Sequence, residues 1–477
     1  MEKNLPLKTP PPKDFRTSMP GWLLNAARYM GINEAVSYVF LGRGWSMISG
    51  LVTIKLILVY MTPELQGYYY SINNLLQMQL FLELGLGIII IHLSSSEFAK
   101  LRWSETLTLE GDEKAKHRIA SLLQKTTKFY GFMGLLFIFI TIPLGIFILS
   151  NGGLELTYWL IPWVLIVMSA AVKLACIPIN MIFAGAGKIN IVSRYQTFAT
   201  IFAVIAMWGG IIMGLNLYAL ILLSWVTTGF INFNLIRRFW PALRELFAIK
   251  VVHPVSWKKE IWPYQSRSGF NVIADWIFLQ SATPIILNNQ GSVEAGKIGI
   301  TLSIIMVFIG LGASWMITRS VEFSGKLALG KTQEAYNYFI SILSKIFPVV
   351  FLGLLGVLLS IWLINTFDIP FLSQYKDRLL EPTTAFLLIV FLLSNFLFNS
   401  FRIYLRAYKK EPFFFYSIFY SIILFSSNIY FSFHSVYLMC LSQAIIGVIF
   451  CLGFGSYYFH YIRNKWDLEI HNGLAIS

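Results

Sequence analysis

Residues 129–149 read FYGFMGLLFIFITIPLGIFIL, an apolar run without a single charged side chain. A helix needs about 20 mostly apolar residues to cross the hydrocarbon core of a bilayer. Comparable runs recur from residue 34 to residue 462, and the whole chain is 56% hydrophobic and only 13% charged. Because these runs are continuous rather than alternating, they favour transmembrane helices over the strands of a barrel.

The apolar runs predict twelve helices and leave no stretch long and polar enough for a separate soluble domain. We expect the spans near 34–60, 66–93, 127–149, 158–184, 190–213, 217–236, 263–288, 296–318, 339–366, 381–404, 413–431 and 435–461. The fold class is therefore an all-α integral membrane protein.

The basic residues predict how the chain is oriented, because helical membrane proteins keep Lys and Arg in their cytoplasmic loops. With twelve spans and the N-terminus inside, 31 of the 37 Lys and Arg fall on the cytoplasmic side. Only Lys297, Lys376 and Arg378 fall outside, and three more fall within spans. This sorting predicts two cytoplasmic termini, and it explains the net charge of +14 without a nucleic acid as partner.

Two of the loops allow further predictions, one on the cytoplasmic side and one on the external side. The stretch 112–128 mixes basic and apolar residues, which suits either an amphipathic helix on the inner leaflet or an ordinary cytoplasmic connector. The longest external loop, near 367–380, is short. We therefore expect no membrane enzyme of glycan transfer or polymerisation, which would need an external domain to carry its site.

A weak internal repeat predicts the architecture. SEFAKL at 96–101 follows the second span and VEFSGKL at 321–327 follows the eighth, while ELQG at 64–67 is matched by EAG at 294–296. The offset is about 225 residues, which is six spans, so the two halves have the same orientation and form a parallel repeat.

Two six-helix lobes around a central cavity follow from this repeat. We divide the chain into five parts: a cytoplasmic tail (1–33), an N-lobe (34–240), a cytoplasmic linker (241–262), a C-lobe (263–462) and a second cytoplasmic tail (463–477).

Charged side chains inside spans are costly and mark candidate functional sites. The candidate cations are Arg43, Lys55, Lys173 and Arg267, and the candidate acids are Glu83 and Asp275. Because cations outnumber acids, the cavity is expected to bind an anion such as a phosphate or diphosphate head group.

The spacing of polar residues along the predicted helices adds further candidate site residues. Arg267, Asn271 and Asp275 recur every four residues and share one helix face, so Asn271 joins the substrate-binding candidates. Span 1 has a stripe of Arg43, Ser46, Gly50 and Thr53, and span 2 has one that runs from Asn73 and Gln77 to Gln79 and Glu83. These faces are expected to form cavity walls.

Structural roles remain open for the same residues. Arg43 with Glu83, and Arg267 with Asp275, could be buried ion pairs, and Lys55 could extend to the membrane surface. Lys173 has no obvious acidic partner within the spans.

No ATP site is expected. The sequence most similar to a phosphate-binding loop is GAGKI at 185–189. It lacks the first Gly and the final Ser or Thr of that motif, and it lies at the end of a span. Glu83 and Asp275 are therefore the candidates for coupling to H⁺ or Na⁺, and no other cofactor is expected. The three cysteines and six histidines show no metal-ligand spacing.

Three segments then carry a family resemblance. YMTPELQGYYY at 60–70 with QLFLELGLG at 79–87, the stretch from Ala274 to Gly299, and YLRAYKKEPF at 404–413 resemble polysaccharide flippases of the MOP exporter superfamily. These segments are spread over both halves of the chain.

The resemblance implies a secondary transporter of the bacterial inner membrane that flips an undecaprenyl-diphosphate-linked oligosaccharide, such as an O-antigen unit of lipopolysaccharide. It also implies membrane lipids and other polysaccharide-assembly proteins as partners, and a substrate role for Arg43 and Arg267. The alternative is an ion-coupled multidrug or cation antiporter of the same superfamily, which should have an acidic cavity. A glycan polymerase is a weaker alternative.

Overall fold

The computed structural model describes residues 34–83, 85–262, 276–277, 280–367, 373–408 and 410–471. Almost all of them are helical, and eight helical stretches are long and apolar enough to cross a membrane, or nine when a bent pair is counted. The chain is a multi-pass membrane protein, as predicted. Within these ranges the one β element is a two-stranded antiparallel hairpin of β1 (Leu101–Trp103) and β2 (Leu109–Gly111).

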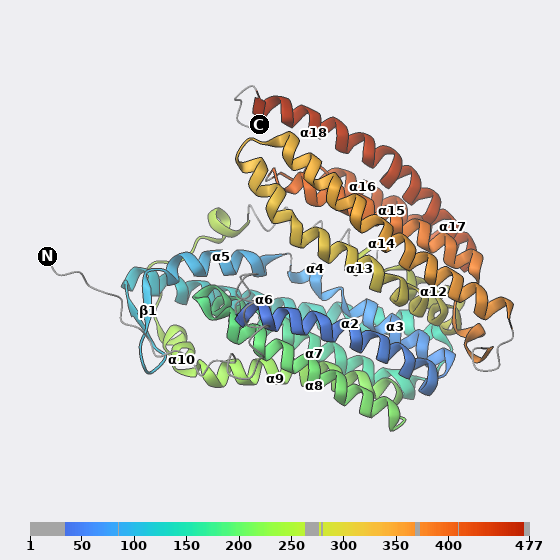
Figure 1. The fold of residues 1–477 in the computed structure, drawn as a ribbon. Coiled ribbons are helices and arrows are strands. Elements are labelled where there is room, and N and C mark those ends of the chain that lie inside the picture. The colour runs from blue at the N-terminus through green and yellow to red at the C-terminus, as the bar shows by residue number, and fades with distance from the viewer. Residues whose placement is uncertain are drawn as a thin grey trace, which may run out of the picture.

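The helices form two bundles, and the blue-to-green helices of Figure 1 make up the first. Its elements are α2 (Glu34–Tyr60), α3 (Pro63–Leu76), α4 (Gln79–Glu83), α5 (Leu86–Phe98), α6 (Glu113–Leu149), α7 (Leu156–Phe183), α8 (Ile189–Ile212) and α9 (Ala219–Arg238). Short helical turns at η2 (Ser150–Gly152), η3 (Ala184–Lys188) and η4 (Asn216–Tyr218) join them. This bundle corresponds to the predicted N-lobe.

The yellow-to-red helices of Figure 1 form the second bundle, which corresponds to the predicted C-lobe. Its elements are α12 (Ala282–Gln290), α13 (Ser292–Ala328), α14 (Thr332–Thr366), η6 (Ser373–Arg378), α15 (Pro382–Arg406), α16 (Phe414–Ser432), α17 (Val436–Ile446), η7 (Gly447–Phe454) and α18 (Gly455–His471). Its core is rich in aromatic rings, with Tyr404 packed among Phe323, Phe339 and Phe459.

The helices follow the predicted spans closely where they are described. The apolar stretch Leu156–Ile212 holds two predicted spans, because the chain turns at η3, where Gly187 has a left-handed φ of 75°. Spans 11 and 12 are also separate: α16 ends at Ser432, and the Ser435 side chain caps the first turn of α17. Most of the predicted span 263–288 lies outside the described residues, so the count of twelve stays a prediction.

The repeated segments meet across the lobe interface, at the end of the molecule that we call the clasp end (residues 61–67, 291–296 and 378). There α3 packs along α13 (Figure 1), and Gly67 faces Ser292 so closely that a Cβ at Gly67 would overlap the Ser292 carbonyl. A Cβ at Gly296 would lie 3.0 Å from the Pro63 carbonyl oxygen. The two segments with similar sequences therefore contact each other, and the parallel repeat itself stays a prediction.

The opposite end, which we call the hairpin end, carries the β-hairpin and corrects one expectation. Residues 112–128 are not a helix on the membrane surface: Asp112 caps α6, and this 37-residue helix runs on without a break into the third span. Its length exceeds what a span requires, so its first turns project beyond the membrane.

The segments predicted as the linker and the second tail both contain helix. Residues 241–262 include most of a helix, α10 (Trp240–Ala248), and a single helical turn, η5 (Trp257–Ile261). The second tail, predicted to begin at residue 463, starts inside α18, which continues to His471.

Candidate functional site

A cavity of about 160 Å³ lies inside the N-lobe, between α3, α4, α7 and α9. Lys173 of α7 lines it together with Gln77, Gln79 and Ser224. Leu76, Ile166, Leu220 and Leu223 supply apolar parts of the wall. The site is therefore a polar recess within an apolar membrane bundle.

Several polar groups in this wall have no partner. Within the described part of the chain, the side chains of Gln77, Gln79 and Ser224 make no hydrogen bond, and Lys173 makes no ion pair. Lys173 keeps an exposed side chain although the lobe surrounds it, so its ammonium group is reachable through the cavity. Lys173 is exposed and the other three residues are half-buried, so these polar groups are free to hydrogen-bond to water or to a bound ligand.

Glu83 lies beside this cavity, where the second span bends by 45° between Pro63–Glu83 and α5. Gly85, with a left-handed φ of 66°, forms the bend, and Glu83 Oε1 lies 2.9 Å from where a Cβ on Gly87 would stand. Glu83 and Lys173 interact electrostatically, because α4 packs against α7. Tyr130 of α6 also faces Glu83, and its buried hydroxyl has no partner among the described residues.

The structure thus places an acid near Lys173 that the spacing did not indicate, although the two side chains form no ion pair among the described residues. Sequence spacing identifies residues on one helix face, but it does not identify which helices touch. The expected pairing of Glu83 with Arg43 stays a prediction, since Arg43 lies on α2 but its side chain is outside the described part.

The other candidate residues from the sequence do not line the N-lobe cavity or lie outside the described residues. Lys55 is exposed on α2 and does not line the N-lobe cavity, so the structure does not bring it to Lys173. Arg267, Asn271 and Asp275 lie outside the described residues. Thr53, expected on a cavity wall, instead accepts a hydrogen bond of 2.8 Å from Trp208 Nε1 of α8. The span 1 stripe is therefore partly a contact between helices.

Two features of the site escaped the sequence analysis. Ser224, Thr227 and Thr228 of α9 line the cavity, and their spacing of three and four on one helix face was a usable signal. Arg402 falls at the end of the predicted span 381–404 and is one of the 31 cations assigned to the cytoplasmic side, but it lies within α15 and is only 4% exposed. It interacts electrostatically with Cys451, so the C-lobe also buries a cation.

Hydrogen bonds hold the clasp end shut. Gln66 Nε2 donates to the Gly296 carbonyl at 2.8 Å, across the lobe interface. Arg378 donates to the Met61 carbonyl and, at 3.2 Å, to Gln66 Oε1. These bonds link both lobes at the point where the glycines already bring the backbones together.

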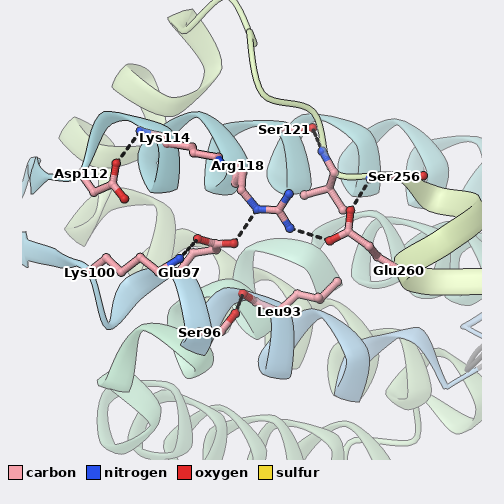
Figure 2. A network of polar contacts seen from close by, with 11 residues as sticks. Leu93, Ser96, Glu97, Lys100, Asp112, Lys114, Arg118, Ser121, Ser256 and Glu260 are labelled. Carbon is pink, nitrogen blue, oxygen red and sulfur yellow. Dashed lines mark hydrogen bonds and ion pairs between the residues drawn. The ribbon is translucent and has the colours of Figure 1, made fainter.

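The hairpin end has a different arrangement, which Figure 2 shows. The Arg118 guanidinium of α6 bridges Glu97 of α5 and Glu260 of the linker. The linker is also fixed to α6 through Ser121, which accepts from the Val255 amide at 3.1 Å, and through Lys125, which donates to the Val255 carbonyl at 2.7 Å. The linker is thus attached to the N-lobe.

Hydrogen bonding sets the charge of Glu260. Partial burial favours a higher pKa for this carboxyl, but the bonds from the Ser256 amide and the Arg118 guanidinium outweigh that effect. The pKa of Glu260 therefore lies below its ordinary value, and the carboxylate is ionised at neutral pH.

No metal site is evident among the described residues, where no group of three or more His, Cys, Asp or Glu side chains could hold an ion. Cys440 and Cys451 are buried, Cys176 is half-buried, and all three are free thiols.

Comparison with known proteins rests on structure alone, because no protein-family model and no curated protein matches the sequence. A multidrug resistance MATE family transporter of the MOP superfamily, solved in its inward-facing conformation, is similar with a TM-score of 0.64 at 10% identity. The match covers 88% of this chain and 96% of the transporter.

The lipid II flippase MurJ, in an inward closed conformation, is also similar, with a TM-score of 0.54 at 15% identity over 91% of this chain and 90% of MurJ. A MATE in complex with MaL6 gives 0.53 at 10% identity, over 91% and 98% of the two chains. The chain therefore has the all-helical fold of MOP superfamily transporters.

Proposed function

We propose that this protein is a flippase that moves an undecaprenyl-diphosphate-linked oligosaccharide, such as an O-antigen unit, across the bacterial inner membrane. The observation that carries the proposal is Lys173, a membrane-embedded cation that faces a polar cavity without an ion pair among the described residues. An ammonium group in such a place suits the diphosphate of a lipid-linked sugar. The unpartnered amides of Gln77 and Gln79 suit its hydroxyl groups.

The two ends of the molecule support alternating access as the mechanism. The clasp end is closed by contacts between the lobes, and the most similar MATE structure quoted above is inward-facing. In our proposal the hairpin end is cytoplasmic, as the cation sorting predicts, and both termini lie on that side. Substrate would enter from the hairpin end and leave when the clasp opens.

Glu83 is the proposed carrier of H⁺ or Na⁺, with Asp275 as the second candidate. Its carboxyl group lies at the bend of the second span and interacts with Lys173. Protonation or cation binding there would change the charge that Lys173 experiences, and so would link ion movement to substrate binding.

The fold does not choose between this function and a multidrug antiporter, because MATE and MurJ structures both resemble the chain. The charge of the cavity does favour an anion. An organic cation would be repelled by Lys173, and the only acid near the cavity among the described residues, Glu83, already interacts with that lysine.

Reconstitution in liposomes tests the proposal. A fluorescent undecaprenyl-diphosphate-linked oligosaccharide on the inner leaflet should become accessible to an impermeant quencher only when the protein is present. Arg43→Ala, Lys55→Ala and Arg267→Ala should each slow this transfer if the sequence candidates bind substrate. Transfer no faster than in empty liposomes, together with export of an organic cation, would assign the antiporter function instead.

A further inference from the structure

A second cationic site lies at the hairpin end, on the turn η3 that joins α7 to α8. Gly185 packs so tightly against α5 that a Cβ there would overlap the Ser94 hydroxyl. Gly187 then turns the chain and has open space around it. Lys188, the next residue, is therefore carried on a well-anchored turn, 15 residues beyond Lys173, or about 20 Å along the helix axis.

A cluster of aromatic rings supports Lys188. Trp103 of β1 stacks on Phe98, with ring centroids 5.8 Å apart, and contacts Phe183 and Phe239, which stack on each other at 4.2 Å. Lys188 Nζ lies 5.2 Å from the centre of the Trp103 ring. Rings packed in this way hold a lysine by a cation–π contact and limit its freedom.

Arg238, the last residue of α9, brings a second positive charge to the same place. It lies beside the Phe239 ring, and it is close enough to Lys188 for the two cations to repel each other. Neither of them forms an ion pair with a carboxylate within the described ranges. Arg238 is exposed and Lys188 is half-buried, so solvent screens part of this repulsion, and an anion placed between the two cations would be attracted by both.

Nearby carboxylates are already engaged elsewhere. Glu97 and Glu260 pair with Arg118, and Glu245 pairs with Lys116. The hairpin end thus contains matched ion pairs on the linker side and, beside them, two cations without such a pair among the described residues: Lys188 over the Trp103 ring and Arg238 beside the Phe239 ring. The amide groups at the start of α8, a 24-residue helix that follows Lys188, add further positive potential.

We infer that Lys188 and Arg238 bind a phosphoryl group at the hairpin end, at a site separate from the N-lobe cavity. A lysine ammonium beside an arginine fork is a common arrangement for phosphate recognition. The phosphoryl group could belong to a prenyl diphosphate, to a phospholipid or to a soluble diphosphate, since all three present the same chemistry. The inference does not rest on the proposed transport function.

Protection of Lys188 from acylation tests this site. The full chain is solubilised in a maltoside detergent, which carries no phosphate, and treated with an amine-acylating reagent, and modification of Lys188 is measured by peptide mass spectrometry. The probes are farnesyl diphosphate, phosphatidylglycerol and inorganic pyrophosphate, each added separately. At four times its Kd, a bound probe should slow the acylation of Lys188 about fivefold, by the factor 1 + [L]/Kd.

Substitutions at Arg238 and at the neighbouring Arg237 distinguish binding at this site from a general effect of positive charge. Arg238→Gln should abolish the protection and Arg238→Lys should keep most of it, while Arg237→Gln is the matched control and should behave like the wild type. Protection by pyrophosphate supports binding of the phosphoryl group alone, and protection by only the two lipids supports a membrane-anchored ligand. Protection by no probe, or equal protection in Arg238→Gln and wild type, would overturn the inference.

Discussion

The interiors of the two lobes differ, although the sequence predicts that the lobes are parallel repeats of each other. The N-lobe encloses a polar cavity that Lys173, Gln77 and Gln79 line. The hollow in the described part of the C-lobe is larger, about 410 Å³, but it lies between α13 and α14 and is almost entirely apolar. Its only polar lining group, the Ser360 hydroxyl, is satisfied by the Gly356 carbonyl at 2.8 Å.

Among the described residues, the polar cavity thus lies in the N-lobe, whereas both lobes build the clasp. The clasp residues Gly67 and Gly296 are equivalent in the predicted repeat and meet each other. The cavity residues have no such counterpart in the described part of the C-lobe. The predictions below test whether the clasp and the cavity are indeed separable.

Gly67→Val should have the largest effect. The new side chain would overlap the Ser292 carbonyl, so closing the clasp should become unfavourable by about 3 kcal/mol, within the range for overpacked contacts. A cysteine introduced at Gln77, in a chain without its native cysteines, should then react with a thiol reagent added at the clasp side.

Gly131→Val is the control for that change, because Gly131 of α6 has open space around the position of a Cβ. It should leave the labelling of position 77 unchanged. Equal labelling in both variants would show that the glycine contact does not hold the clasp.

Lys173→Met should slow transport without opening the clasp. Loss of one charge-assisted contact to a diphosphate is expected to weaken binding by about 1.5–3 kcal/mol, which is about 10–100-fold in the transport rate at low substrate. Initial rates in liposomes measure the change. Ser360→Ala in the C-lobe hollow should transport normally, and a similar loss in both variants would contradict the assignment of the polar site to the N-lobe.

Arg378→Ala should weaken the clasp moderately. It removes the bonds to the Met61 carbonyl and Gln66 Oε1, which are worth about 1–2 kcal/mol together at a half-buried site. Labelling at position 77 should rise about tenfold, less than in Gly67→Val. Lys376→Ala, at an exposed neighbour on η6, should match the wild type, and a Lys376→Ala effect as large as that of Arg378→Ala would point to general charge.

Glu260→Gln should have the smallest effect, about 0.5–1 kcal/mol, confined to attachment of the linker to α6. Because the folded pKa of Glu260 is lowered, its contribution is complete above the ordinary glutamate pKa of about 4.3 and disappears as the pH falls through the lower folded value.

Hydrogen exchange of the 249–256 amides tests whether the stabilisation by Glu260 is lost only as the pH falls. In the wild type, protection should be constant between pH 5 and 8 and should fall only in more acidic solution, while Glu260→Gln should show the faster exchange already at pH 7. Glu110→Gln, an exposed hairpin residue, is the control. A decline of wild-type protection at pH 6 would contradict the assignment to Glu260.

The sequence supports the fold more fully than the site for a physical reason. Apolar runs report burial in lipid directly, so α6 and the pair α16 and α17 lie where they were predicted. The repeat of ELQG and EAG indicated equivalent positions, but only the packed structure shows that these segments touch.

Contacts between helices could not be predicted from a single sequence. The proximity of Glu83 to Lys173 depends on α4 packing on α7, and the Arg118 bridge depends on α5, α6 and the linker converging. Arg402 was misplaced because basic residues near a span end usually lie in a loop, whereas α15 extends past it to Arg406.

The central claim is that the N-lobe cavity holds the head group of the lipid-linked sugar. Photo-cross-linking tests it most directly, with a benzophenone amino acid at Gln77 in the cavity and, separately, at Val357 in the C-lobe hollow. If the N-lobe cavity binds the head group, the sugar should cross-link at position 77, Lys173→Met should reduce this product, and position 357 should yield none. Cross-linking of the head group at position 357 but not at position 77 would contradict binding in the N-lobe cavity.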